Sequence, residues 1–179
     1  MPALALTDHG NMFGVLNFEH ICHANGINPI VGCEFYVTET DHKVQERTKY
    51  GGKYYHLILL CENETGYKNM SWLCSNAYTE GLHYGKPNID FEMLKERHEG
   101  LICLSACIQG QIPQALLNDD DEWAEEVADR TLQLAQMLYN GALNHFNQFK
   151  SVQGQANESS HRKNMHTYVS TISFFLLLT

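Results

Sequence analysis

Five side chains that can bind metal ions or transfer protons lie beside short apolar runs of the sequence. They are Asp8, His9, Glu34, His56 and Cys107. Imidazole, carboxylate and thiolate groups perform this chemistry when a fold holds them together. Because the five are far apart in the sequence, a site exists only if the elements that carry them converge.

Asp8 and His9 come directly after residues 3–6, an apolar run with the composition of a buried parallel strand. In α/β proteins, ligands and catalytic groups collect at the carboxyl ends of such strands. The pair is therefore a site candidate. The alternative is that Asp8 caps the next helix and His9 is a hydrogen-bonded loop residue.

Glu34 interrupts an apolar strand predicted over residues 30–37. A carboxylate inside such a strand is costly unless it is paired or bound to a metal ion. The alternative is an edge strand whose alternate side chains meet water.

Two further strands are predicted, over residues 54–61 and 101–104; His56 lies within the first and Cys107 follows the second. His56 lies at the start of its strand, which suits a carboxyl-end site only if that strand is antiparallel to its neighbour. Cys107 follows the carboxyl end of its strand, where the alternative role is packing.

Helices are predicted between these strands, and this alternation indicates an α/β domain with a largely parallel sheet. Asn63 and Asp90 are suited to cap two of the helices. The polar residues 38–53 predict a long excursion or mobile hairpin, and a loop is expected through Gly85 and Pro87.

The composition excludes several classes of protein. The net charge of −9 argues against a basic nucleic-acid binder, although metal ions could supply positive charge toward a phosphate ester. The six cysteines form no CxxC pair, which excludes a zinc ribbon. The late apolar run 174–178 is too short to span a membrane, so we expect no membrane role. No signal peptide precedes the first strand, so we expect a cytoplasmic protein with reduced thiols.

Residues 140–179 differ in character from the rest of the chain. Residues 144–164 are rich in Gln, Asn, Ser and His and show little apolar periodicity. We therefore expect one domain over residues 1–139 and a divergent, poorly ordered tail over residues 140–179.

Four ordered segments carry a resemblance to a known family: PALALTDHGNMFG from residue 2, NPIVGCEFYV from residue 28, YHLILLCENETGYKN from residue 55 and LICLSACIQG from residue 101. Together they resemble the PHP (polymerase and histidinol phosphatase) domain of bacterial DNA polymerase III alpha subunits. The resemblance extends to about residue 136.

The resemblance implies an α/β fold, a distorted seven-stranded β/α barrel of TIM-like type, with up to three metal ions at the carboxyl ends of its strands. His9, Glu34, His56 and Cys107 match a histidine ligand, the bridging carboxylate, a second histidine ligand and a thiolate at or near the metal. Asp8 matches the family's neighbour of the first histidine. Zinc, manganese or iron would suit these ligands.

The implied activity is metal-dependent phosphodiester hydrolysis, the 3′-to-5′ exonuclease proofreading of DNA replication, with DNA and other replicase subunits as partners. The family's first motif, His-x-His, would precede Met1, and its closing Asp-x-His pair would follow residue 140; neither occurs in these 179 residues. We therefore expect a fragment with an incomplete barrel, an incomplete metal cluster and little activity, and no polymerase domains. The alternatives are a non-catalytic structural module of the polymerase and a stand-alone phosphoesterase.

Overall fold

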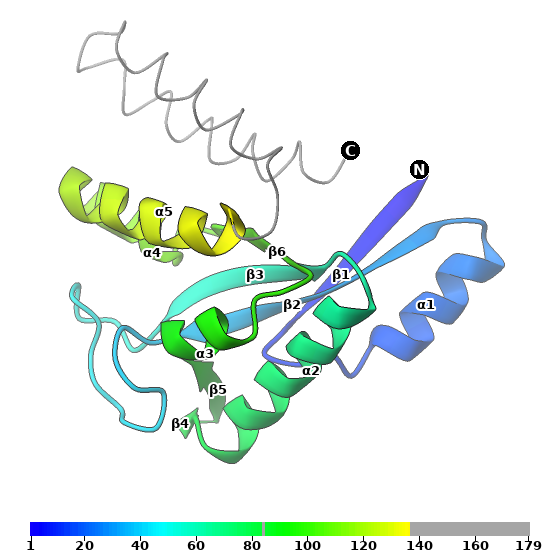
Figure 1. Cartoon of the computed structure of the whole chain (residues 1–179), viewed down its shortest axis with the longest axis horizontal. Coiled ribbons are helices and arrows are strands. Elements are labelled where there is room, and N and C mark those ends of the chain that lie inside the picture. The colour runs from blue at the N-terminus through cyan, green and yellow to red at the C-terminus, as the bar shows by residue number, and fades with distance from the viewer. Residues whose placement is uncertain (84, 137–179) are drawn as a thin grey trace, which may run out of the picture.

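The computed structural model describes residues 1–83 and 85–136, which form a mixed α/β structure (Figure 1). The predicted tail from residue 140, with its boundary, lies outside the described residues. The elements are β1 (Ala3–His9), α1 (Val15–Ala24), β2 (Asn28–Val37), β3 (Tyr55–Cys61), α2 (Glu64–Thr79), β4 (Leu82–His83), β5 (Lys86–Ile89), α3 (Phe91–Glu96), β6 (Leu101–Leu104), α4 (Gln111–Leu117) and α5 (Asp121–Gln136).

The strands form an open six-stranded sheet around β2. Along β2, residues 28–34 pair with β1 and residues 36–37 pair with β5, both in parallel. On the other side, β3 is antiparallel to β2 and to β6. The prediction of a largely parallel sheet is thus wrong for β3. The segment between β2 and β3 contains no helix that could cross over the sheet, so β3 returns antiparallel beside β2.

The short hairpin of β4 and β5 was not predicted, because Gly85 and Pro87 indicate a loop. In the structure Leu82 pairs with Pro87, and β5 continues the sheet beyond the end of β1. Its strand conformation depends on pairing with Tyr36 and Val37 of β2, which local sequence does not reveal.

The hydrophobic core lies between one face of the sheet and the helices α2 and α3 (Figure 1). From the sheet it contains Cys33, Phe35, Val37, Leu59 and Ile89, and from the helices Met70, Leu73, Ala77, Met93 and Leu94. The two helices begin at the predicted caps: Asn63 accepts a hydrogen bond from the Gly66 N–H, and Asp90 accepts one from the Met93 N–H. Because strand side chains alternate, Glu34 and Tyr36 point to the opposite face.

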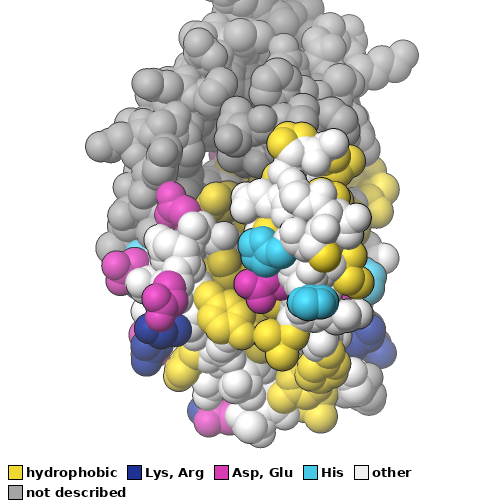
Figure 2. All heavy atoms as spheres, turned by 90° about the vertical axis from the view of Figure 1, so that its right-hand side faces the viewer, with side chains coloured by type: hydrophobic (Ala, Val, Ile, Leu, Met, Phe, Trp, Pro, Cys, Tyr) yellow, Lys and Arg dark blue, Asp and Glu magenta, His cyan; other side chains and the backbone are white. Residues whose placement is uncertain are grey.

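The helix α1 packs with Val15 and Cys22 buried. Its outer side, with the turn before it, exposes Phe13, Leu16 and Ile21. Figure 2 shows hydrophobic, acidic and histidine side chains together on the face that carries this helix. Among the described residues, no helix is long and apolar enough to cross a membrane.

Candidate metal centre

The register of the sheet brings three of the predicted site residues onto one face. His9 pairs with Glu34 across β1 and β2, and Tyr36 pairs with His56 across β2 and β3. Since β3 is antiparallel to β2, the start of β3 lies beside the carboxyl end of β2. The condition under which His56 could join a carboxyl-end site is therefore met.

Glu34 lies between the two imidazole rings. Its Oε1 is 2.8 Å from Nδ1 of His9 and 3.0 Å from Nδ1 of His56. The exposed fraction of the side chain is 11% for Glu34 and 14% for His56, but 71% for His9. Because β2 pairs along both edges at Glu34, the edge-strand alternative is wrong. The carboxylate is instead buried against two nitrogen partners.

Cys107 reaches the same place from the loop after β6. Its Sγ lies 3.5 Å from Nδ1 of His56, and its side chain is exposed. The chain turns there through Ala106, whose φ of 60° is left-handed, and the His56 N–H donates to the Gln109 carbonyl at 3.0 Å. The thiol therefore faces the site and is not packed in the core.

Asp8 lies apart from the other four residues. It pairs with Cys33, so as a strand neighbour of His9 its side chain points to the opposite face of the sheet. A Cβ placed on Gly14 would lie 2.9 Å from its Oδ2, which puts the carboxylate beside the start of α1. The N-cap residue of α1 is Gly14, and no side chain caps this helix, so the alternative in which Asp8 is its cap is not seen.

The pKa of His56 is lowered, first because burial disfavours the charged ring and then through electrostatic interactions with His9 and Lys86. Glu34 acts in the other direction and does not compensate. His56 is consequently neutral near pH 7. A neutral imidazole is the form that can donate a lone pair to a metal ion.

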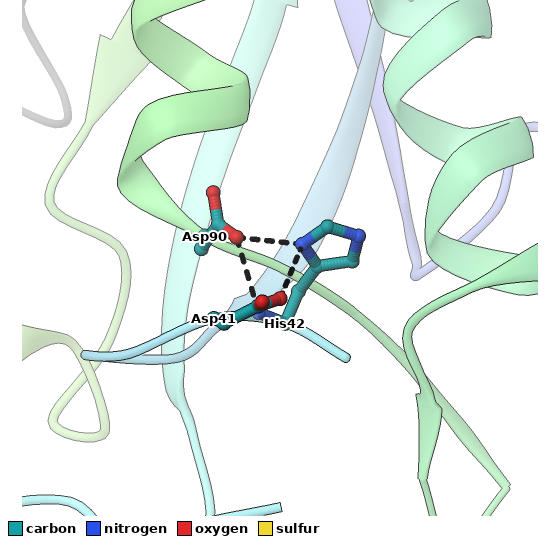
Figure 3. A group of neighbouring side chains, drawn as sticks. All are labelled: Asp41, His42 and Asp90. Carbon is teal, nitrogen blue, oxygen red and sulfur yellow. Dashed lines mark hydrogen bonds and ion pairs between the residues drawn. The ribbon is translucent and has the colours of Figure 1, made fainter. Parts of the chain in front are cut away.

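A second histidine and carboxylate group, which the sequence did not single out, consists of Asp41, His42 and Asp90 (Figure 3). One ligand-type atom from each lies within 4.8 Å of the others, close enough to hold a metal ion. Oδ2 of Asp90 lies 2.6 Å from Nδ1 of His42 and accepts the His42 N–H at 3.0 Å. Its Oδ1 accepts the Met93 N–H at 2.9 Å.

Both carboxylate oxygens of Asp90 are therefore used by protein donors. The group ties the excursion after β2 to the start of α3. Asp120 holds the excursion at a second point. Nζ of Lys49 forms an ion pair with its Oδ2 at 2.7 Å, and the Tyr50 hydroxyl donates a hydrogen bond to the same oxygen at 2.9 Å. Only the cap, Asp90, could be found from local sequence, because a histidine in a polar segment carries no signal of its own.

Comparison with known proteins gives matches over most of the described chain. The family model described as "PHP domain" matches residues 1–139. The DNA polymerase III subunit alpha of Treponema pallidum is 52% identical over 126 residues, which cover 70% of this chain and 11% of that protein. The proteins of the same name from Chlamydia muridarum and Thermus aquaticus are 50% and 47% identical, over 68% and 69% of this chain and 10% of each relative.

The chain thus spans about a tenth of the length of the curated relatives it matches.

Proposed function

The chain belongs to the PHP domain family, and we propose that His9, Glu34, His56 and Cys107 form part of a divalent-metal centre that hydrolyses phosphodiester bonds. The substrate would be the 3′ end of DNA, in the proofreading of a bacterial DNA polymerase III alpha subunit. The observation that carries this proposal is the position of Glu34, whose Oε1 contacts Nδ1 of both histidines.

The four side chains suit a metal ion chemically. Two imidazoles, a carboxylate and a thiolate match the ligands of zinc, and manganese or iron would suit additional carboxylates. Oε1 of Glu34 contacts Nδ1 of both rings, which supports the proposal that these side chains share one site. To hold an ion, His9 and His56 would exchange these contacts for the metal, with each Nδ1 unprotonated.

The remaining chemistry divides between the ion and the protein. A bound divalent ion acidifies water and supplies positive charge next to a phosphate ester. The ring of His56 is held by an edge contact with Tyr36 and by stacking on Tyr54, with centroids 5.4 and 5.9 Å away. The side chain of His9 is exposed and is therefore accessible to a substrate.

We further propose that the open sheet is part of a β/α barrel, and that the 179 residues supply only some of its metal ligands. On its own this chain would then bind fewer ions than a complete centre and show little nuclease activity. We also propose DNA and other replicase subunits as partners and the cytoplasm as the location; the partners are supported by relatives named as a subunit of DNA polymerase III. A polymerase module that uses the same residues only for structure is the second candidate.

The test measures zinc binding by calorimetry, together with digestion of a 3′-labelled single strand, in the 179-residue chain. We expect Glu34→Gln to weaken zinc binding roughly 100-fold, because a partly buried ligand is lost. Glu62→Gln changes an exposed glutamate at the other end of β3 and serves as the control. Equal zinc affinity in both variants would refute the metal centre. Robust digestion that Glu34→Gln abolishes would support the centre but contradict the expected inactivity.

A further inference from the structure

Lys86, at the start of β5, is connected to the candidate metal centre through Tyr36. Its Nζ donates a hydrogen bond to the Tyr36 hydroxyl at 3.0 Å and lies 4.8 Å from the centroid of that ring. The Tyr36 ring is buried, and it also contacts the rings of His56 and Tyr54, with centroids 5.4 and 4.6 Å away. One fixed aromatic ring therefore separates the ammonium group from a candidate ligand.

The sheet places Lys86 on the same face as Glu34. Tyr36 pairs with Asn88 in parallel, and Glu34 and Lys86 lie two residues earlier in each strand. Gly10 permits the close approach of β1 to β5, because a Cβ on it would lie 2.8 Å from Cγ of Pro87. The end of β1, which carries His9, is consequently packed directly against the start of β5.

The partner of Lys86 differs from those of other lysines in the described structure. Four of them, Lys43, Lys49, Lys68 and Lys95, form ion pairs with carboxylates. Lys86 instead donates to a phenol, the hydroxyl of Tyr36. An ammonium has three N–H donors, so the bond to Tyr36 leaves two for another acceptor.

We propose that Lys86 is a substrate-binding residue that contacts a phosphate group of the DNA strand at the metal centre, with Tyr36 holding the ammonium in position. This inference rests on the proposed function, since it assigns the substrate contact of the same site. In a chain of net charge −9, a fixed ammonium beside the centre gives a phosphate a local attraction that the whole molecule lacks.

The experiment measures binding of a fluorescently labelled tetrathymidylate with a free 3′ hydroxyl to the zinc-loaded chain, by anisotropy at several salt concentrations. Lys86→Met removes the charge, and Lys86→Arg restores it. Lys68→Met removes a lysine charge on the exposed side of α2 and controls for net charge. We expect Lys86→Met to weaken binding about tenfold, because a hydrogen bond to a charged group is lost. The slope of log affinity against log salt should fall by about 0.7, the value for one phosphate contact on a single strand.

Lys86→Arg should bind within about threefold of the unchanged chain, since it keeps the charge. Equal affinity and slope in Lys86→Met and Lys68→Met would overturn the proposal. Zinc binding, measured in the same samples, separates this result from the proposed function. If the chain binds no zinc but loses the oligonucleotide on Lys86→Met, the metal centre fails and the phosphate contact stands. If zinc binds and Lys86→Met has no effect, the phosphate contact fails alone.

Discussion

Asp90→Asn tests the anchor between the excursion and α3 with minimal change of shape. The asparagine keeps one oxygen that can cap α3 by accepting the Met93 N–H, as Oδ1 of Asp90 does at 2.9 Å. It replaces the other oxygen by an amide NH2. That group cannot accept the two bonds that His42 makes to Oδ2, at 2.6 and 3.0 Å.

The expected loss follows from these contacts. A hydrogen bond to a charged group contributes about 1.5–3 kcal/mol, and a buried donor left without an acceptor adds a further penalty. Both side chains are mostly buried, with exposed fractions of 9% for His42 and 12% for Asp90. We therefore expect about 3 kcal/mol of destabilisation, or a fall in Tm of roughly 8–12 °C for a domain of this size.

The contacts of Asp90 also determine how the stability of the fold should change with pH. Burial alone would raise the pKa of Asp90, but hydrogen bonds from the Met93 N–H and from His42 lower it below the ordinary 3.8. The carboxylate thus stabilises the fold above about pH 4, and this contribution is lost as the pH falls through the lowered pKa.

Urea unfolding of the 179-residue chain at about pH 6 and at stepwise lower pH measures both effects. Asp41→Asn is the control, because Asp41 is 59% exposed and 3.5 Å from the ring, so it should cost no more than about 0.5 kcal/mol. Two results would refute the reasoning: equal stability of the two variants at pH 6, or a difference between Asp90→Asn and the unchanged chain that does not shrink on acidification.

Three further substitutions have expected outcomes. Gly10→Ala should destabilise the fold by about 1–2 kcal/mol and weaken zinc binding, since φ of Gly10 is 69° and a Cβ would lie 2.8 Å from Cγ of Pro87. Urea unfolding and calorimetry with zinc measure the two effects, and unchanged values would contradict the close packing. Asn63→Ala removes the cap that accepts the Gly66 N–H at 3.0 Å and should cost about 1 kcal/mol in urea, whereas Asn63→Asp should be nearly neutral. Leu73→Ala, at a fully buried position of α2, should cost about 2–5 kcal/mol by thermal unfolding; a smaller loss would mean that the core there collapses around the gap.

The sequence predicts the elements that have strong local signals. The apolar run of β2 and the capping residues Asn63 and Asp90 place β2, α2 and α3 within a few residues of their bounds. Capping works as a signal because the side chain bonds the backbone three residues away, so that the evidence and the structure are both local.

The sequence does not predict features that depend on distant pairing. β5 contains Pro87 and lacks alternation, and it is a strand because β2 offers its edge there. The direction of β3 depends on the excursion between β2 and β3, and that direction decides whether His56 meets Glu34. Predicting that Asp8 and His9 lie apart requires knowing where β1 ends. Because the strand extends through His9, these consecutive side chains point to opposite faces of the sheet.

The two histidine and carboxylate groups show why proximity alone does not identify a functional site. In one group Asp90 accepts hydrogen bonds from the backbone N–H groups of His42 and Met93 and also contacts the His42 ring. Breaking these contacts would uncap α3 and release the excursion. In the other, Oε1 of Glu34 contacts two side-chain nitrogens, while the backbone around it is held independently by the pairing of β1, β2 and β3. The partners of Glu34 can therefore change without disturbing the sheet. A carboxylate that can exchange its partners on a fixed backbone is suited to a ligand, whereas one that holds the backbone together is suited to structure.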